Sequence, residues 1–565
     1  MSENTLPATP ETFAGADWDR IEPEYDALER RSETDTAWVR DWSALEDLIE
    51  EAMAAAYVGY TTDTENEERE RLHLRWATEI EPRLEERRTR LARRLVDSGW
   101  SEPGMEPALN AFRNQISLFR EENLPLSAEV AGLTSAYQKR VGAMQVEWDG
   151  ETLTIPRVMA KLGEPDRDVR ERAYRAYLSP YVAQRAELAA LFDELLGLRR
   201  RIAANAGLPS YRDYAHQEKN RFDYTPDDCL RFHEAVEKAV VPAAGRVLRR
   251  RQEKMGLETL RPWDVEGASD PLGRPPLTPF RDASELIAGS GRIFQRVDPL
   301  LGGRFQKMVA KQLLDLESRH GKAPGGYCIH LPHRGLPFIF ANSVGTQQDV
   351  ETLLHESGHS FHVFEAAALP YHWQRDYGSE IAEVASMSME LLSNPYLASA
   401  EGGFYTEEDA HRAREEHLER ILLFFGHCAS VDAFQQWIYT HPEGGDADAR
   451  DRRWIELRSR FEPAIDFSGL DRERAARWYK QLHIFELPFY YIEYGLAQLG
   501  ALQVWRNSRR DRGAAIAAYR RALALGSTKP LDELFAAAGA RLVFDADGMA
   551  ELVDVVEEEL ARLRG

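Results

Sequence analysis

Apolar residues recur at helical spacing through most of this 565-residue chain. This pattern runs from Trp18 to about Leu133, from Arg157 past Arg251, and again from Val350 onward. A segment whose apolar residues recur every three or four positions buries one face of an α-helix. The chain is therefore predicted to be mainly α.

Two segments depart from this pattern and are predicted to form strands. Residues 144–156, MQVEWDGETLTIP, alternate around Asp149–Gly150, a dipeptide typical of tight hairpin turns. Residues 321–350 are rich in Gly and Pro and contain the apolar run FIFA at 338–341. We interpret them as a small sheet with tight turns. This sheet directly precedes the segment TLLHESGHSFHVF at 352–364.

Composition argues against several classes of partner and location. The formal net charge of −23, from 94 acidic and 71 basic residues, would repel phosphate groups. We therefore expect no nucleic acid or membrane partner. Three widely spaced cysteines indicate no disulfide framework. The N-terminal residues lack the pattern of a signal peptide, and no stretch of 18 apolar residues occurs. These features predict a cytoplasmic protein.

The histidine-rich segment contains His355, Glu356 and His359. Four residues of an α-helix turn through about 400°, so the two histidines lie on one face, about 6 Å apart along the axis. Two imidazoles at this spacing can bind one zinc ion, with Zn–N distances of about 2.0–2.1 Å. Glu356, beside them, can accept a proton from the attacking water. The pattern is that of a zinc peptidase.

These residues alone leave an alternative open. With 15 histidines in 565 residues, about one random chain in 25 of this composition would contain the same pattern. The alternative is a buried helix whose histidines bond to neighbouring backbone or carboxylate groups. His362 does not decide the question. It lies one turn further along, and three ligands in a row on a straight helix cannot surround one ion.

A catalytic zinc site needs a third protein ligand. Residues 377–397 form an apolar helical segment that contains Glu380, Glu383 and Glu390, with Ser379 as a candidate cap. Carboxylates on a buried helix face are costly unless they are paired or bind a metal. We expect Glu383 to be the third ligand and Glu390 to orient a ligand histidine. Glu380 is expected at the exposed N-terminal end of the helix, where the helix dipole favours an acid.

A second candidate group follows in residues 481–505, with His483, Tyr490, Tyr491 and Tyr494. A buried aromatic helix explains most of these side chains. A zinc peptidase also needs donors aimed at the oxyanion that forms when water attacks the scissile carbonyl. His483, Tyr491 and Tyr494 could present one imidazole and two phenols to such a point. Both interpretations stay open on these residues alone.

Three stretches resemble the core motifs of the M3 family of zinc metallopeptidases, of the oligoendopeptidase F type, with thimet oligopeptidase a more distant relative. They are GGYCIHLPHRGLPFIFANSVGTQQDVETLLHESGHSFH, SEIAEVASMSMELL and HIFELPFYYIEYGLAQ. The similarity extends upstream through LGEPDRDVRERAYRAY (162–177) and LRRRIAANAGLPSYRDYA (198–215). It covers most of residues 140–505, whereas the first 130 residues match only as a helical region.

The resemblance implies a role for each candidate residue. The metal ligands would be His355, His359 and Glu383, with one zinc ion per chain, and the general base would be Glu356. His483 and Tyr491 would stabilise the oxyanion, and Tyr494 would help to bind substrate. Tyr490 is adjacent, which leaves open which of the two tyrosines faces the zinc. Two departures from relatives are Ala385 in place of proline and the pair Ser343–Val344.

The resemblance also implies a fold and a kind of substrate. We expect a two-lobed helical shell around a deep substrate channel, with the small sheet next to the HExxH helix. Such a channel admits short unstructured peptides. The strand that contains Phe340 and Ala341 would hold substrate by backbone pairing. Residues 1–15 would form a flexible arm, residues 16–185 an N-terminal helical region, and residues 186–565 the catalytic domain.

The resulting hypothesis is a zinc-dependent endopeptidase that acts on oligopeptides. Cobalt or manganese would also suit the ligand set. A zinc carboxypeptidase or dipeptidase on a similar scaffold is the alternative within enzymes, and it would need a basic residue to hold the terminal carboxylate of its substrate. A non-catalytic peptide-binding protein is the alternative from another class. Glu356 argues against it, because binding alone needs no base beside a metal. The sequence leaves oligomeric state and cleavage preference open.

Overall fold

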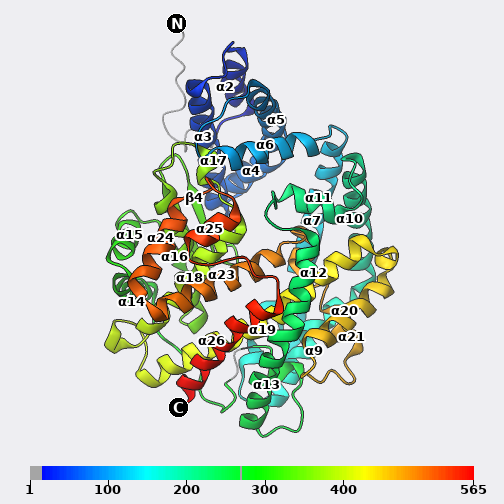
Figure 1. Ribbon diagram of the computed structural model, residues 1–565. Coiled ribbons are helices and arrows are strands. Elements are labelled where there is room, and N and C mark those ends of the chain that lie inside the picture. Colours follow the sequence, from blue (N-terminus) through cyan, green and yellow to red (C-terminus); the bar gives the residue numbers. More distant parts are fainter. Residues whose placement is uncertain (1–14, 268–269) are drawn as a thin grey trace. The chain divides into compact units, whose positions relative to one another are not determined.

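The computed structural model describes residues 15–267 and 270–565. Helices dominate these residues, and strands form only two small sheets (Figure 1). The prediction of a mainly α protein with a small sheet next to the HExxH helix is confirmed. The predicted N-terminal arm, apart from Gly15, lies outside the described residues. None of the helices in the described ranges is long and apolar enough to cross a membrane.

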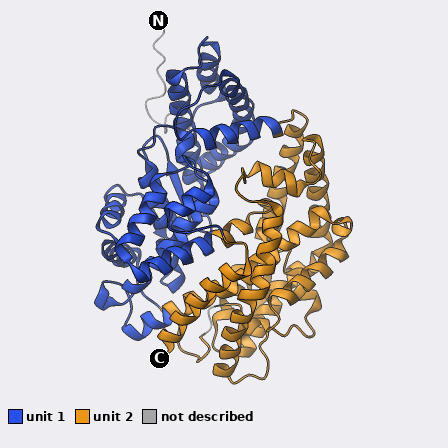
Figure 2. Cartoon of the chain, in the orientation of Figure 1, with its two compact units in different colours: residues 1–117, 278–413, 497–542 blue, residues 118–277, 414–496, 543–565 orange. Residues whose placement is uncertain are grey.

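The chain forms two compact units, each assembled from three separate stretches of sequence (Figure 2). Unit 1 contains residues 1–117, 278–413 and 497–542, and unit 2 contains residues 118–277, 414–496 and 543–565. Residues 185 and 186 both belong to unit 2, so the division expected between them is not the division between these units. An independent domain of residues 186–565 stays a prediction.

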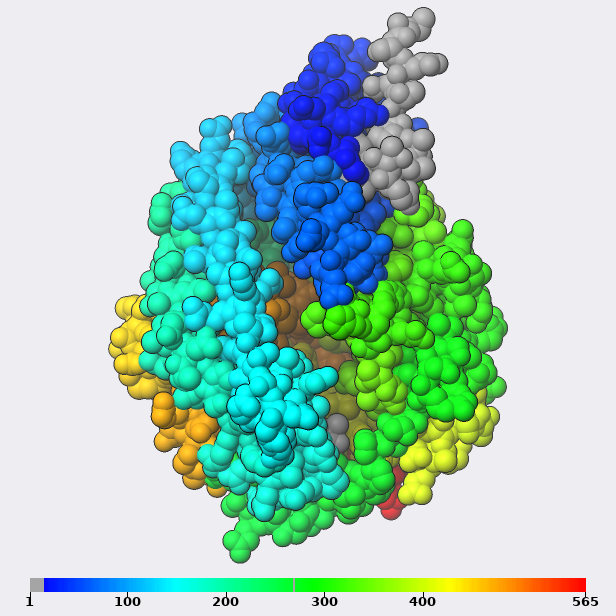
Figure 3. Space-filling view, turned by 180° about the vertical axis from the view of Figure 1, so that it is seen from behind, coloured from blue at the N-terminus to red at the C-terminus, as the bar shows by residue number. Residues whose placement is uncertain are grey.

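The first stretch of unit 1 is a group of helices whose surface is blue in Figure 3. They share a core that includes the buried indole rings of Trp38, Trp42 and Trp76. These helices are α2 (Trp18–Arg30), α3 (Thr36–Thr62), α4 (Glu67–Arg75), α5 (Glu81–Ser98) and α6 (Glu106–Leu118). A π turn, Trp76–Ile80, joins α4 to α5 just before Pro82. Proline has no N–H to donate, which disrupts the regular helical hydrogen bonds at this junction.

The second stretch of unit 1 carries the small sheet. Its order is β3-β5-β4, with β3 (Leu314–Glu317) parallel to the central strand β5 (Leu336–Ser343) and β4 (Tyr327–Leu331) antiparallel to it. In the register, Ile339 of β5 lies opposite Leu314 on one side and Cys328 on the other. Strand β3 was not predicted from the sequence, because its four residues follow a helical segment and contain two acids.

Helix α16 (Gln347–Ala366) carries the histidine-rich segment and packs against both β5 and α18 (Ser379–Ser393). Its start is set by a capping box, in which the Thr346 side chain accepts from the Asp349 N–H and the Asp349 carboxylate accepts from the Thr346 N–H. The remaining helices of unit 1 are α14 (Ala283–Val297), α15 (Pro299–Ala310), α17 (His372–Arg375), α24 (Arg512–Ala524) and α25 (Leu531–Ala537).

Unit 2 contains the predicted hairpin, β1 (Gln145–Trp148) and β2 (Glu151–Thr154), which is confirmed. Both turn residues have positive φ, 52° at Asp149 and 87° at Gly150, as the tightest hairpin turns require. The helices that lie wholly in this unit are α7 (Asn123–Gly142), α8 (Ile155–Ala160), α9 (Arg167–Ala183), α10 (Arg185–Asn205), α11 (Tyr211–Glu218), α12 (Pro226–Ala235), α13 (Val241–Met255), α20 (Ala447–Phe461), α21 (Asp471–Ala476), α22 (Leu482–Glu486) and α26 (Ala546–Arg564).

Two long helices contribute residues to both units. Helix α19 (Glu407–Thr440) belongs to unit 2 from residue 414 onward, and α23 (Tyr491–Arg510) belongs to unit 2 up to residue 496. The acid-rich stretch 441–451 follows α19, and α20 already begins within it, at Ala447. Asp446 caps this helix by accepting from the Ala449 N–H, so an acid-rich stretch becomes a helix start rather than a loop.

Candidate metal centre

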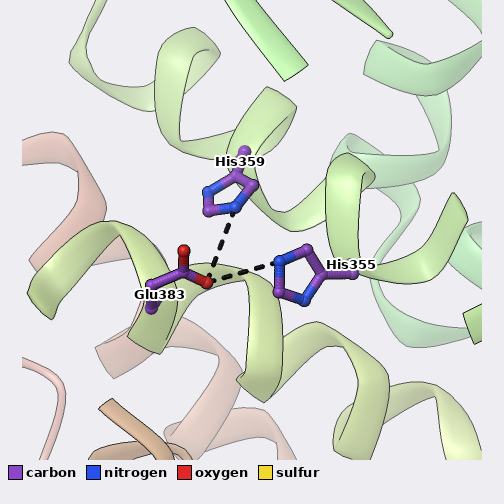
Figure 4. Close-up of side chains that lie close together, drawn as sticks. All are labelled: His355, His359 and Glu383. Carbon is purple, nitrogen blue, oxygen red and sulfur yellow. Dashed lines mark ion pairs between the residues drawn. The ribbon is translucent and has the colours of Figure 1, made fainter. Parts of the chain in front are cut away.

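Three side chains of unit 1 converge at the contact between α16 and α18 (Figure 4). The Nε2 atoms of His355 and His359 lie 3.3 Å and 3.8 Å from the same oxygen, Oε2 of Glu383. The two imidazole rings are 5.0 Å apart between centroids. The helix spacing of four residues therefore places both rings on the face of α16 that meets α18, and Glu383 reaches them from the next helix.

The three donor atoms fit a zinc ion. In a tetrahedral site with bonds of about 2.0–2.1 Å, neighbouring ligand atoms lie about 3.4 Å apart. The distances from Glu383 Oε2 to the two histidine nitrogens lie close to this value. Two imidazoles and one carboxylate are also the ligand set of many catalytic zinc sites, which keep a fourth position for water or substrate.

Each of the three candidate ligands also has a partner of its own. His355 Nδ1 lies 2.7 Å from Glu390 Oε1, which leaves Nε2 to face Glu383. The ring of His359 forms a hydrogen bond with the backbone of Ala382. Glu383 itself accepts from the Ser386 hydroxyl at 2.9 Å. Such partners hold the rings in one orientation, with the Nε2 atoms toward the possible metal position.

Glu356 lies next to His355 on α16 and is buried, with 7% of its surface exposed. Burial raises the pKa of its carboxyl group to about 7, against the attraction of His355 and a hydrogen bond from the backbone N–H of Cys328. Cys328 belongs to β4, so the edge of the sheet contacts this carboxylate. The sequence prediction that a glutamate stands beside the ligand pair thus corresponds to a buried acid with one backbone donor.

The candidate oxyanion donors form a separate cluster in unit 2. His483 lies on α22, and its ring centroid is 5.0 Å from that of Tyr491 and 6.2 Å from that of Tyr494. Tyr490 also contacts this group, with its ring 5.9 Å from His483. The structure thus brings the predicted imidazole and phenols together. Both Tyr490 and Tyr491 contact the His483 ring.

A family model, described as peptidase family M3, matches residues 161–553, which is more than half of the chain. The chain belongs to peptidase family M3. The predicted enzyme class, a peptidase of this family, is confirmed. The match begins after the first helices of unit 1, in agreement with the sequence resemblance, which was weakest over the first 130 residues.

Curated relatives resemble this M3 chain at low identity. An oligoendopeptidase F homolog of Borreliella burgdorferi is 24% identical over 45% of the chain and 42% of its own length. The group B oligopeptidase PepB of Streptococcus agalactiae is 25% identical over 42% of the chain and 38% of its own length. The alignments thus span less than half of these two relatives.

Solved structures match the M3 chain over nearly its whole length. Pz peptidase A, solved with an inhibitor, has a TM-score of 0.88 and 27% identity, and the match covers 97% of this chain and 98% of that one. A structure assigned to oligoendopeptidase F has a TM-score of 0.86 and 27% identity, over 99% and 98% of the two chains.

Gly358 of this M3 peptidase is a site residue that the sequence analysis did not single out. A Cβ atom at this position would lie 2.5 Å from the Ser386 Cα and 2.6 Å from the Ala385 carbonyl oxygen. Only glycine allows α16 and α18 to approach so closely, which brings Glu383 within reach of the histidines. The glycine between the two histidines was the one sequence feature that could have indicated this close helix packing.

Two buried arginines of the M3 chain hold the segment that carries His483 and Tyr491. Arg199, 1% exposed, donates to the carbonyl oxygens of Ile484 and Phe485 at the end of α22. Arg221 donates to the Phe489 carbonyl oxygen at 2.6 Å. Phe489 has a φ of 64°, a conformation that is rare for a bulky residue and needs support from its surroundings. These arginines lie far upstream, so no local pattern pointed to them.

Three further residues of α16 and α18 were considered in the sequence analysis: His362, Ser379 and Glu380. The structure differs from the expectation for Ser379 and Glu380. His362, which lies one turn beyond the ligand pair, is fully buried and stacks on Tyr377. Glu380, expected at an exposed helix end, is only 6% exposed. The helix N-cap is Gly378 rather than Ser379, which is the first helical residue. The expectation of an exposed Glu380 is therefore wrong, because this end of α18 is buried by the tertiary fold.

Phe340 and Ala341 lie on the central strand of the small sheet of this M3 peptidase. Phe340 is fully buried, stacks on Tyr327, and pairs with β3 on one side and β4 on the other. The Ala341 carbonyl oxygen accepts from Lys322 at 2.5 Å. Since both edges of the strand at Phe340 are already paired, this arrangement does not favour the expected pairing of a substrate backbone with these two residues.

Proposed function

We propose that this chain is a zinc-dependent endopeptidase that hydrolyses internal bonds of short, unstructured oligopeptides. One observation carries the proposal: two histidine nitrogens and a carboxylate oxygen converge beside a second, buried carboxylate. The first three atoms supply a ligand set, and the fourth group supplies a base. We keep the expectation that nucleic acid and membranes are not partners, which the net charge of −23 supports.

In this proposal His355, His359 and Glu383 hold the zinc ion. When bound, zinc would polarise the scissile carbonyl group and lower the pKa of a water molecule. Glu356 takes the proton of the attacking water and passes it to the leaving amine. Its burial and the N–H of Cys328 hold the carboxylate in place for this transfer. Glu390 fixes the orientation of His355.

We propose His483 and Tyr491 as donors to the oxyanion and Tyr494 as a substrate-binding residue. The family resemblance and the contacts among the three rings within unit 2 support these roles. Preorganised donors of this kind lower the barrier by stabilising charge that develops only in the transition state.

The substitution Glu356→Gln tests the proposal. We expect the variant to bind zinc as the unmodified chain does and to lose about 100-fold or more in kcat, because amide nitrogen and oxygen cannot take up the proton. Metal analysis and cleavage of a quenched fluorescent peptide would measure both properties. Appreciable turnover by the variant would overturn the assignment of Glu356 as the base.

Peptides blocked at both ends separate this function from its alternatives. An endopeptidase cleaves them, and a chelator abolishes the cleavage. A carboxypeptidase or dipeptidase needs a free terminus and would leave them intact, as would a non-catalytic peptide-binding protein. Mass spectrometry of the products would identify the bonds that are cut, with the chelated protein as the control.

A further inference from the structure

A hydrogen-bond donor serves catalysis only if its proton points toward the reacting atoms. A tyrosine hydroxyl has one proton and two acceptor positions, and a neutral imidazole has one N–H and one acceptor nitrogen. The direction in which His483 and Tyr491 donate is therefore decided by the groups that donate to them. The cluster in unit 2 contains two such groups, neither of which was singled out from the sequence.

The first group is the side-chain amide of Gln481, the N-cap residue of α22. Its nitrogen, Nε2, lies 2.6 Å from the Tyr491 hydroxyl oxygen and 3.4 Å from His483 Nδ1. An amide nitrogen can only donate. Gln481 therefore makes the Tyr491 oxygen an acceptor, and it makes His483 Nδ1 an acceptor as well. The single proton of neutral His483 then resides on Nε2.

The second group is His427 of α19. Its Nδ1 lies 2.8 Å from Nη1 of Arg458, and its Nε2 lies 3.4 Å from the Tyr491 hydroxyl oxygen. Arginine has no acceptor atom, so His427 Nδ1 must accept and Nε2 must carry the proton. That proton points to Tyr491. Arg458 is 2% exposed and pairs with Glu462, the C-cap residue of α20, which fixes its own position.

Charges around His427 keep it in this state. Burial lowers its pKa well below the usual range, and the positive charges of Arg458, Arg477 and Lys480 lower it further. Arg458 lies on α20, and Arg477 and Lys480 lie in the segment after α21. Neutral His483 lies on α22, and Tyr491 faces the ring from α23. His427 thus remains a neutral imidazole with one proton, on Nε2, at neutral pH.

We infer that Gln481 and His427 are positioning residues that fix the direction in which Tyr491 and His483 donate. The Tyr491 oxygen accepts from both, so its own proton is directed away from them, and His483 presents its Nε2–H. The inference rests on the proposed function, in which these two protons meet the oxyanion of a cleaved peptide. It adds a chain of four contacts, Arg458–His427–Tyr491–Gln481–His483, that holds both donors ready.

Exchange of one atom in Gln481 tests the inference. In Gln481→Glu a carboxylate oxygen replaces the donating nitrogen, so Tyr491 and His483 Nδ1 would donate to it and no longer to substrate. We expect kcat to fall about tenfold or more with little change in KM, because donation in the transition state is what is lost. Gln481→Met should give a smaller fall. A kcat for Gln481→Glu equal to that of the unmodified chain would overturn the inference.

Gln138→Glu is a matched control for this experiment. Gln138 donates to Glu486 on the same helix, α22, so the control introduces the same charge beside the same helix without touching Tyr491 or His483. We expect it to retain kcat. An equal fall in both variants would mean that added negative charge, rather than the lost donor, is responsible, and it would also overturn the inference.

A second comparison uses His427 and Tyr491. Gln at position 427 can still donate from its amide, whereas Met of similar length cannot, so His427→Gln should retain more activity than His427→Met. In the background of Tyr491→Phe, His427→Met should cause no further loss, because its effect acts through the missing hydroxyl. Additive losses in the double variant would contradict the inference.

The tautomers of His427 and His483 can be determined by NMR spectroscopy, without measuring peptidase activity. In protein labelled with ¹⁵N-histidine, the ring nitrogens of His427 and His483 should show the Nε2–H pattern, assigned by loss of signals in His427→Gln and His483→Gln. The His427 pattern should persist from neutral to mildly acidic pH. An Nδ1–H pattern for either ring would overturn the inference. Failure of the unmodified chain to cleave any blocked peptide would instead overturn the proposed function and leave this result standing.

Discussion

At the scale of single residues, the candidate metal centre depends on partners that lie behind the ligands. His355 can offer Nε2 to a metal because Nδ1 is already engaged by Glu390 at 2.7 Å. Glu383 is held by the Ser386 hydroxyl in the same way. A ligand that is fixed before the metal arrives loses less conformational entropy on binding, so these partners contribute to metal affinity without touching the ion.

Substitution of Glu390 tests this contribution. Glu390→Ala should weaken zinc binding about 10- to 100-fold, because His355 loses the acceptor that fixes its tautomer and orientation. Competition with a chromogenic zinc chelator would measure the change. Glu79→Ala, which removes an exposed acid of unit 1, serves as the control and should leave the affinity unaltered. Equal zinc affinity in Glu390→Ala and the unmodified chain would show that His355 needs no such partner.

At the scale of secondary structure elements, the site depends on the close packing of α16 against α18, which a glycine at position 358 allows. Gly358 faces the Ala385 and Ser386 backbone with no room for a side chain. Tyr519 of α24 adds a hydrogen bond to the Ala385 carbonyl oxygen at 2.8 Å, which holds the same turn of α18 from another side. The position of Glu383 is thus a consequence of helix packing, and a small increase in helix separation would move it away from the histidines.

Gly358→Ala should therefore reduce both stability and metal binding. The added methyl group must displace backbone atoms of α18, at a cost of about 1–3 kcal/mol, and the zinc affinity should fall with the separation of the helices. Thermal unfolding and chelator competition would measure the two effects. Gly132→Ala is the matched control, because this glycine of α7 is exposed and a Cβ there meets no atom within 4 Å. It should be neutral or stabilise by about 0.5–1 kcal/mol.

At the scale of the whole molecule, buried ion pairs make the stability of the fold depend on pH. Glu266 of unit 2 is an example, since it pairs with Arg477 at 2.6 Å and accepts from the Tyr177 hydroxyl at 2.6 Å. Burial alone would raise the pKa of this carboxyl group, but the charges of Arg477 and Lys480 and the bond from Tyr177 outweigh it and lower the pKa to about 2.

The sign of the effect follows from this lowered pKa. The carboxylate is favoured in the folded state, so its contribution to stability is complete above the unfolded pKa of about 4.5 and is lost as pH falls toward about 2. Urea unfolding should show Glu266→Gln less stable than the unmodified chain at pH 7, with the difference shrinking between pH 4.5 and 2. An exposed control, Glu33→Gln, should show no such convergence. A constant difference across this range would contradict the assignment.

The two small sheets and Glu380 show which features of the fold local sequence patterns can predict. The hairpin around Asp149 was predictable, because its turn residues need positive φ and its strands are adjacent in sequence. Strand β3 was not predictable, because it pairs with β5 more than twenty residues away and its own sequence resembles the end of a helix. Glu380 was placed at a surface for a similar reason: helix position is local, but burial depends on what packs against the helix.

The sequence by itself determined that His355, Glu356 and His359 share one helix. A helix forms through hydrogen bonds between residues four positions apart, so it can be predicted from the local sequence. It also indicated Glu383, since a carboxylate in an apolar helix needs a partner. Only the tertiary structure decided that this carboxylate meets both histidines, through the close packing that Gly358 allows. It alone brought Gln481, His427 and Arg458 around the tyrosines, because residues distant in sequence meet only when helices pack.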